Sequence, residues 1–386
     1  MDASLIILLV GSCVAASCAL LGTFLVLRKM TLMGDAISHA VLPGIAIAFL
    51  WSGGRNALPM VIGAAALGVL TVFLVEVGTR SRRLQEDASI GVVFPALFSI
   101  GVILISRYAG QVDLDLECVL YGEIAYTPLD IVYWQGRELG PRALWINLPI
   151  LAGVVAFILF FYKELKLSTF DPALAAALGF SPILLHYLLM TILSVTIVGA
   201  FESVGAILVV AMLVVPAATA YLLTERLSVM LGLSVLFGVS SAISGYFVAR
   251  QLDASIAGSM AMMAGAIFAL GFLFSPRHGL VAKALHHRRL ALGMAEQLLM
   301  LHIGHGAGSN GSQGRADTED GCDMETLIQR FNWRPKQLSK VVERLERQGW
   351  LAHTAASSVH SPKVYLTAAG QQALERTGQA PLRHQI

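Results

Sequence analysis

The stretch ASLIILLVGSCVAASCALLGTFLVL, Ala3–Leu27, is free of charged residues. At about 1.5 Å per residue, such a helix crosses the roughly 30 Å hydrocarbon core of a bilayer. Asp2 precedes the stretch, and Arg28 and Lys29 follow it. This order is the reverse of a signal peptide, in which the basic residues come first. The sequence therefore predicts a retained span that enters the membrane from the outside.

The composition of the whole chain agrees with this prediction. Of its 386 residues, 56% are hydrophobic and only 13% are charged, whereas about 25% are charged in a typical soluble domain. The formal net charge of +2 does not indicate a nucleic-acid partner. The bilayer lipid is the expected surrounding of most of the chain.

Further apolar runs recur along the sequence. Uninterrupted runs cover 3–27, 56–75, 88–106, 143–162, 203–224, 227–249 and 254–276. Two more are interrupted: 36–54 contains His39 and Pro43, and 181–201 contains His186 and ends just before Glu202. Basic clusters fall on alternate sides if all these segments cross, which places the C-terminal part inside. We expect an all-α polytopic membrane protein with eight or nine transmembrane helices.

Three ionisable residues interrupt the apolar segments: Asp35, His39 and Glu202. A charged side chain inside a membrane costs about 2.5–3.5 kcal/mol, so such residues tend to mark sites or paired interiors. Asp35 and His39 are four residues apart, which places them on one helix face where they could bind one ion. Alternatively, Asp35 caps the helix and His39 forms a hydrogen bond within the bundle.

Other candidate ligands lie outside the apolar runs. Glu117, Cys118 and Glu123 follow the fourth span, and their oxygen and sulfur donors suit manganese, iron or zinc. The alternative is a solvated loop. Glu202 has Gly199 and Gly205 nearby; it could face a cavity, pair with a neighbouring helix, or serve a helix turn.

Three stretches resemble permeases of the zinc, manganese and iron ABC importer family, and the resemblance covers about residues 1–285. The first is RKMTLMGDAISHAVLPG at 28–44, which is similar to the family's signature. The second contains Phe170, Asp171, Pro172, Ala175 and Gly179 and looks like the cytoplasmic coupling segment that docks on the ATPase. The third runs from FESVGAILVV at 201–210 to PAATA at 216–220.

The resemblance implies a fold like that of a type II ABC importer permease in a bacterial inner membrane. It implies that Asp35 and His39 line the metal path with an acidic partner, Glu117 or Glu123. It also implies alternating access by two permease copies, with a periplasmic metal-binding protein delivering Mn²⁺, Zn²⁺ or Fe²⁺, manganese being favoured. No permanently bound cofactor is expected.

The chain is not expected to be an enzyme. It contains no GxxxxGK[ST] phosphate loop, so ATP hydrolysis is assigned to a separate ATPase subunit. It also contains no HExxH motif, which disfavours a metalloprotease.

The C-terminal part reads as a separate small domain. We expect a permease domain at 1–285, a connecting helix and Gly/Ser-rich linker at 286–322, and a cytoplasmic winged-helix (α+β) domain at 323–386. Helices are predicted at 324–331, at 335–348 with Gly349 as its C-cap, and from Ala368, with a hairpin between. Residues 323–377 resemble the DNA-binding part of iron-dependent repressors. Glu343 and Glu346 interleave with the basic residues of the second helix, so DNA binding is not expected and a regulatory or protein-contact module is favoured.

The alternative function is a membrane-tethered, metal-responsive transcription regulator. A mere anchor would need only one or two spans, so eight or nine spans with polar interruptions favour transport.

Overall fold

The structure is a computed structural model that describes residues 2–52, 57–80, 85–108, 124–134, 137–275, 279, 293–303, 322–323, 327, 331, 333, 335–353 and 363–379. The chain divides into two compact units, Met1–Leu280 and Val281–Ile386. Each unit is described by itself.

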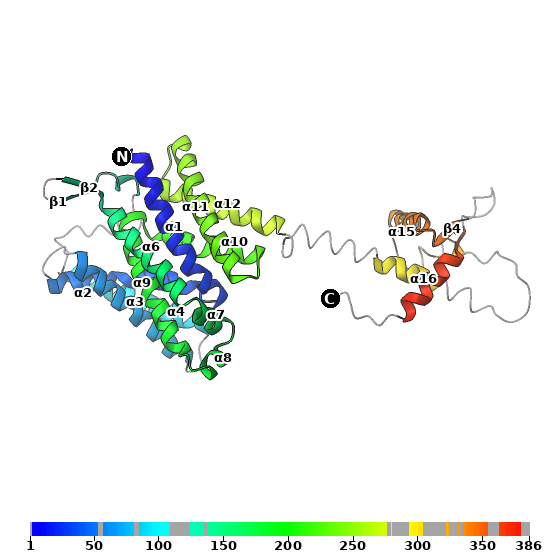
Figure 1. The fold of residues 1–386 in the computed structure, drawn as a ribbon, viewed down its shortest axis with the longest axis horizontal. Coiled ribbons are helices and arrows are strands. Elements are labelled where there is room, and N and C mark those ends of the chain that lie inside the picture. Colours follow the sequence, from blue (N-terminus) through cyan, green and yellow to red (C-terminus); the bar gives the residue numbers. More distant parts are fainter. Residues whose placement is uncertain are drawn as a thin grey trace, which may run out of the picture. The chain divides into compact units, whose positions relative to one another are not determined.

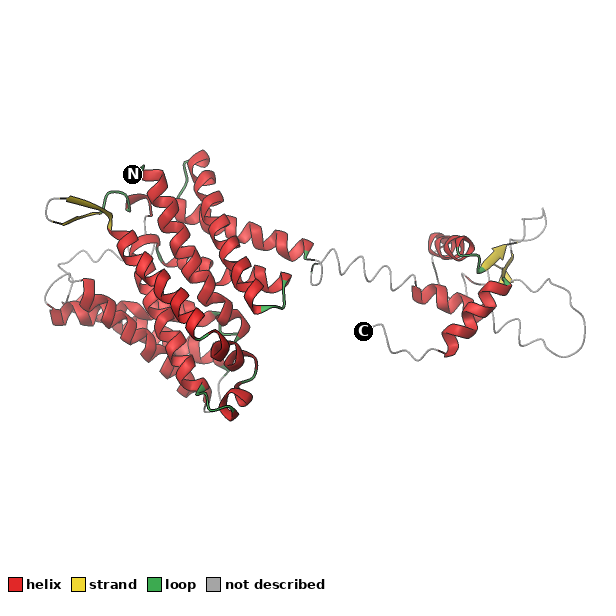
Figure 2. Ribbon diagram, viewed as in Figure 1, coloured by secondary structure: helices red, strands yellow, loops and turns green. Residues whose placement is uncertain are grey.

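The first unit is a bundle of helices (Figures 1 and 2). Its described helices are α1 (Ala3–Leu27), α2 (Leu32–Ser52), α3 (Ala57–Arg80), α4 (Glu86–Tyr108), α6 (Arg142–Phe160), α7 (Tyr162–Phe170), α8 (Pro172–Ala177), α9 (Pro182–Val204), α10 (Ala206–Leu223), α11 (Leu227–Leu252) and α12 (Ile256–Phe274). A 3₁₀ turn, η1 (Ile124–Tyr126), precedes the antiparallel strands β1 (Ile131–Trp134) and β2 (Arg137–Pro141).

Within the described part of the chain, nine of these helices are long and apolar enough to span a membrane. They correspond to the nine segments found in the sequence, so the number of candidate spans equals the upper of the two expected numbers. The two interrupted segments are continuous helices: α2 passes through His39 and Pro43, and α9 passes through His186.

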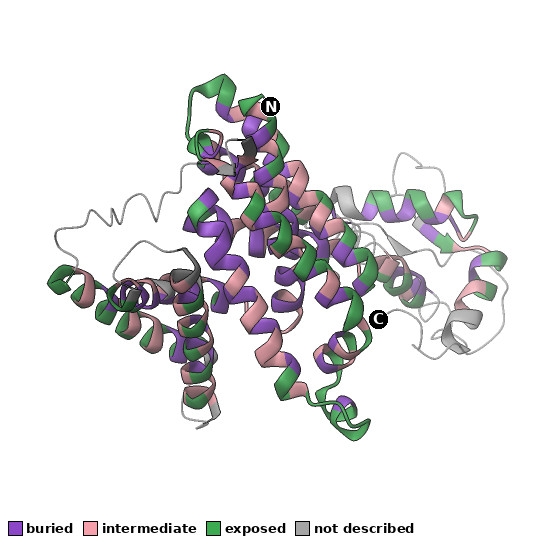
Figure 3. Ribbon diagram, turned by 60° about the vertical axis from the view of Figure 1, so that its left-hand side comes forward, coloured by how far each residue is buried: buried purple, intermediate pink, exposed green. Residues whose placement is uncertain are grey.

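The helices differ in how deeply they are buried (Figure 3). α1 lies at the centre, with 72% of its most apolar window buried, and packs against α6, α10 and α11. α4 lies at the edge, with only 17% buried, and packs against α2 and α3. The apolar side chains that α4 exposes are suited to lipid or to another membrane protein.

A glycine allows α1 and α10 to approach closely. A Cβ atom added at Gly22 would lie 2.7 Å from the carbonyl carbon of Leu213 on α10, which is too close for any side chain. Small residues permit such backbone contact in membrane bundles. At the next residue, Thr23 Oγ1 donates a hydrogen bond of 3.0 Å to Ser234 Oγ on α11. α11 therefore starts at the end of the bundle where α1 finishes.

The two ends of the bundle carry different elements (Figure 1). The start of α1 lies at the same end as β1 and β2, and α7 and α8 lie at the other. We call these the hairpin end and the α8 end. The hairpin was not predicted from the sequence.

The second unit is a small α+β domain. It contains a helix at 293–303, β3 (Cys322–Asp323), α15 (Pro335–Arg347), β4 (Leu351–His353), β5 (Lys363–Leu366) and α16 (Ala368–Gln379). The strands form an antiparallel sheet in the order β3-β5-β4. α15, the β4–β5 hairpin and α16 confirm three of the predicted elements. Most of the predicted helix at 324–331 lies outside the described residues, and β3 was not predicted.

The core of the second unit includes helix 293–303. Leu299, Met300 and Ile303 pack with Leu338 and Leu345 of α15 in one buried cluster. These residues fall within the segment 286–322 that was expected to be only a connection. Residues 304–321, which include the predicted Gly/Ser-rich linker, lie outside the described part of the chain.

Candidate functional site

Asp35 and His39 lie on one face of α2, as their spacing predicted. Asp35 Oδ1 and His39 Nε2 are 3.5 Å apart. α2 begins at Leu32, so Asp35 lies in its first turn and not at its N-cap. A carboxylate in the first turn of a helix is stabilised by the helix dipole. The capping alternative is therefore not the arrangement found.

The pair is more accessible than its neighbours on the same helix. The side chains of Asp35 and His39 are 46% and 30% exposed, whereas Ala36, Ile37 and Ala40 are buried. The His39 ring packs against two rings of α4, with centroid distances of 5.1 Å to Phe94 and 6.1 Å to Phe98. The His39 ring therefore lies beside α4, and the described residues cover the pair only in part.

Carboxylate oxygen and imidazole nitrogen are suitable donors for manganese, iron or zinc. Two donors are fewer than these ions require, since even zinc takes four ligands. Among the described residues, no group of three His, Cys, Asp or Glu side chains could hold a metal ion. Glu117, Cys118 and Glu123, the other proposed ligands, lie outside the described residues. A metal ion bound by this pair would therefore need further ligands.

Glu202 lies near the end of α9 and does not join this pair. Its Oε1 is 3.1 Å from Nη2 of Arg142, the first residue of α6, and Arg142 Nη1 is 4.0 Å from Asp130 Oδ2. These residues line a cavity of about 160 Å³ together with Tyr126, Thr127, Ala143, Ile146 and Ser203. Glu202 therefore both faces a cavity and pairs with a residue of a neighbouring helix, which are two of the three roles considered for it from the sequence. The guanidinium reduces the attraction of this cavity for cations.

Gly205 ends α9 and so places Glu202 close to the end of that helix. With φ at 81° it adopts a conformation that favours glycine, and it alone separates α9 from α10. α6 begins beside the β1–β2 hairpin, so Glu202 and Arg142 lie at the hairpin end.

Four residues of the predicted coupling segment form or flank α8 at the opposite end. Asp171 is the N-cap, and its Oδ1 accepts a hydrogen bond of 2.9 Å from the Leu174 amide. Pro172 occupies the first helical position, where its missing N–H is tolerated. Ala175 is buried, and Gly179 has a φ of 88° that ends the helix. These residues therefore define a short helix whose backbone hydrogen bonds are satisfied locally.

Large apolar side chains surround α8 and face outward. Phe170, Leu174, Leu178 and Phe180 are between 41% and 60% exposed. Because such side chains are usually buried, their grouping at one end of the bundle marks a contact surface.

A polar cluster at the α8 end was not singled out in the sequence. Arg28 contacts Ser168, Thr169 and His186, and Glu76 accepts a hydrogen bond from the Tyr187 hydroxyl. Burial lowers the pKa of the Arg28 guanidinium from its usual value. A signal was present, because Glu76 is an ionisable residue directly after the apolar run 56–75.

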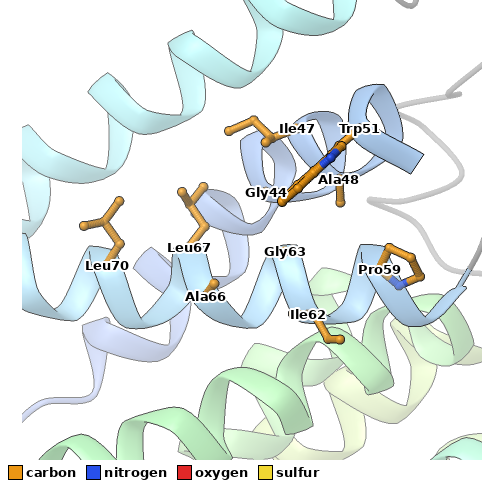
Figure 4. A pocket seen from close by; sticks show the side chains of 10 residues that line it. All are labelled: Gly44, Ile47, Ala48, Trp51, Pro59, Ile62, Gly63, Ala66, Leu67 and Leu70. Atoms are coloured by element: carbon orange, nitrogen blue, oxygen red, sulfur yellow. The ribbon is translucent and has the colours of Figure 1, made fainter. Parts of the chain in front are cut away.

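A larger cavity of about 640 Å³ lies between α2 and α3 (Figure 4). Its lining is apolar and consists of Gly44, Ile47, Ala48, Trp51, Pro59, Ile62, Gly63, Ala66, Leu67 and Leu70. These side chains offer no oxygen or sulfur donors, so this cavity is not suited to bind a cation.

The chain is similar to known transport proteins. The sequence profile of the ABC 3 transport family matches residues 5–275. The manganese transport system membrane protein MntD of Bacillus subtilis is 52% identical over 279 residues, which is 72% of this chain and 94% of that protein. The zinc transport system membrane protein TroD of Treponema pallidum is 41% identical over 364 residues, 94% of this chain and 96% of that protein. The match to TroD therefore extends into the second unit.

The fold also resembles a solved structure. PsaBC from Streptococcus pneumoniae in complex with Fab aligns with a TM-score of 0.61 at 32% sequence identity, covering 72% of this chain and 94% of that chain. Sequence profile, relatives and fold agree, and the chain belongs to the ABC 3 transport family.

Proposed function

We propose that this chain is the membrane permease of an ATP-driven importer for divalent transition-metal ions, and that Asp35 and His39 bind the ion on its path. The observation that carries the proposal is the carboxylate–imidazole pair, 3.5 Å apart on one face of a membrane-spanning helix. Such groups are costly in a membrane and tend to mark ion pathways. The chain is a transport subunit and not the ATPase, as its relatives are membrane proteins of transport systems.

Manganese is the favoured cargo, with zinc and iron next. The relative with 52% identity is named for manganese transport and the one with 41% identity for zinc transport. Aspartate and histidine serve all three metals, so the geometry of the completed site decides between them. The ion is a substrate that passes through, and no resident cofactor is proposed.

A second permease copy would complete the site. The described pair supplies two donors and is only partly covered by the residues that the structure describes, so a symmetry-related pair could supply two more. Either Glu117 or Glu123 remains the proposed acidic partner. Metal bound between two copies could then be exposed to one side of the membrane at a time, which is alternating access.

The two ends of the bundle suit different partners. The exposed Phe170, Leu174, Leu178 and Phe180 support docking of α8 on a cytoplasmic ABC ATPase, with Asp171, Pro172, Ala175 and Gly179 fixing the shape of the segment. The hairpin end would then receive a periplasmic metal-binding protein. This orientation in the bacterial inner membrane follows the alternation of basic clusters and leaves the second unit in the cytoplasm.

The second unit is proposed to be a winged-helix-like module. Its sheet order β3-β5-β4, with α15 between β3 and β4 and a hairpin from β4 to β5, supports that topology. DNA binding is not proposed, because Arg344 and Arg347 of α15 pair with Glu296 and Glu343, at 3.2 Å and 2.6 Å. A regulatory or protein-contact role is favoured. Nothing in the relatives supports the tethered transcription regulator.

Metal uptake tests the proposal. Cells carrying this permease with its ATPase and metal-binding protein would be given radioactive manganese, zinc and iron. Asp35→Ala and His39→Ala should each abolish uptake while the protein remains in the membrane. Asp2→Ala, an exposed aspartate at the start of α1, should take up metal like the wild type. Unchanged uptake by either site variant would overturn the proposed site.

A further inference from the structure

A guanidinium joins three separate parts of the bundle at the α8 end. Arg28 Nε donates to Thr169 Oγ1 at 3.2 Å, and Nη2 donates to Ser168 Oγ at 3.0 Å. Arg28 Nη1 lies 3.4 Å from His186 Nδ1 on α9. Arg28 thus contacts two consecutive residues of α7 and one residue of α9 with its three nitrogens.

This contact pattern requires the shape of arginine. The guanidinium is a planar fork with donors in fixed directions, whereas the ammonium of lysine is a point charge on a flexible stem. Hydrogen bonds from a charged donor are about twice as strong as neutral ones. Arg28 is partly buried, so water screens these contacts less than at an exposed site.

Arg28 is connected tightly to the helix that carries the metal pair. The turn between α1 and α2 is held by the hydrogen bonds Lys29 N to Val26 O at 3.1 Å and Met30 N to Leu25 O at 2.9 Å. Lys29 has a φ of 61°, the left-handed conformation of a helix end. The amide of Met33, in the first turn of α2, donates to Met30 O at 3.2 Å. A displacement of Arg28 is therefore passed to the first turn of α2, which contains Asp35.

The other side of the contact leads directly to α8. Ser168 and Thr169 lie in the last turn of α7, and only Asp171 separates α7 from α8. A cavity of about 210 Å³ beside the network is lined by Met30 and Met33, by Val72, Val75, Glu76 and Thr79 of α3, and by His186. Close packing hinders the movement of side chains in a protein interior, and this cavity leaves room for the α1–α2 turn to move relative to α3.

We propose that Arg28 is a positioning residue that couples the ATPase-docking segment to the metal-binding pair. A movement of α7 and α8 during the ATPase cycle pulls the α1–α2 turn through Arg28 and reorients the start of α2. The inference rests on the proposed function, because it takes α8 as the docking segment and Asp35 and His39 as the metal ligands.

The test measures how much metal is transported per ATP hydrolysed. The complete complex of permease, ATPase and metal-binding protein is reconstituted in vesicles with Mn²⁺ as cargo. Arg28→Lys keeps the charge and loses the fork. We expect the ATPase rate to stay within about twofold and the metal moved per ATP to fall about tenfold, within the range of allosteric couplings. Arg226→Lys, which alters an exposed arginine at the same end of the bundle, should match the wild type.

A second variant removes the partners and leaves Arg28 in place. Ser168→Ala combined with Thr169→Val takes away the two α7 acceptors and should uncouple to a similar extent. If either variant lowers transport and ATP hydrolysis in the same proportion, or leaves metal per ATP unchanged, Arg28 has only a structural role and the inference is overturned. If the wild-type complex moves no metal at all, the proposed function fails and the coupling role fails with it.

Discussion

Replacing Gly22 by alanine should force α1 and α10 apart and destabilise the first unit. The added Cβ would lie 2.7 Å from the Leu213 carbonyl carbon and 3.3 Å from its Cα, and closer still to its oxygen. Carbon atoms prefer separations of about 3.5–4.0 Å, so the helices must separate by about 1 Å. A gap of that size forfeits a quarter to a half of the contact energy along it. The atoms in the way belong to a backbone, which cannot rotate aside.

Overpacking of a closely packed interior typically costs about 1–3 kcal/mol. Because α1 is central to the bundle and 72% of its most apolar window is buried, we expect a loss of about 3 kcal/mol. At about 2 °C per kcal/mol for a domain of this size, the Tm should fall by about 6 °C. The assay is the loss of the monodisperse size-exclusion peak of detergent-purified protein after heating.

Gly153→Ala is the matched control, because a Cβ added at Gly153 on α6 meets no atom within 4 Å. Alanine is favoured over glycine in a helix by about 1 kcal/mol, so the Tm of this variant should not fall. An unchanged Tm for Gly22→Ala, or an equal loss for both variants, would refute the reasoning from close helix approach.

Three smaller predictions concern single contacts. Thr23→Val removes the hydrogen bond to Ser234, but Ser234 still donates to the Met230 carbonyl at 2.8 Å. The loss should be about 0.6 kcal/mol, so the Tm should fall by only about 1 °C. A fall several times larger would contradict this. Leu345→Ala leaves a cavity in the core of the second unit, where Leu345 is fully buried, and should lower the free energy of unfolding of that unit by about 2–5 kcal/mol. In the full chain, amide hydrogen exchange should become faster across α15 but not across α1. Asp171→Ala removes the N-cap of α8 and should lower the stability of that helix by about 1 kcal/mol, which speeds hydrogen exchange of its amides about fivefold. Asp171→Asn keeps a capping side chain and should not speed the exchange. Equal exchange in both variants would argue against the cap.

Hydropathy locates where helices cross the membrane better than where they begin. The second span was predicted to start at residue 36, but α2 starts at Leu32. Asp35 ends the apolar run without breaking the helix, because its backbone still forms the helical hydrogen bonds and its charge suits the first turn. The sixth and seventh spans were predicted to meet near residue 203, whereas the helix boundary is Gly205, where the backbone reverses at a positive φ.

The site was predictable only where its residues are close in sequence. The spacing of Asp35 and His39 is enough to place them on one face, because helix geometry fixes it. The α7 partners of Arg28 lie 140 and 141 residues further along the chain, and no local pattern reveals such pairs. The partner of Glu202 is likewise distant, since Arg142 starts a different helix. Sequence reasoning therefore found the proposed metal-binding pair but not the contacts of Arg28 or the partner of Glu202.

If each of the nine candidate spans among the described residues crosses the bilayer, their odd number puts Asp2 and Gly279 on opposite faces. Two copies of this bundle therefore cannot be joined end to end by a short soluble tether and still share one orientation, because the tether would start on one face and finish on the other. A single-chain dimer would need one additional hydrophobic crossing between its halves. For the same reason, a reporter protein fused before Asp2 and one fused after Gly279 would lie in different compartments.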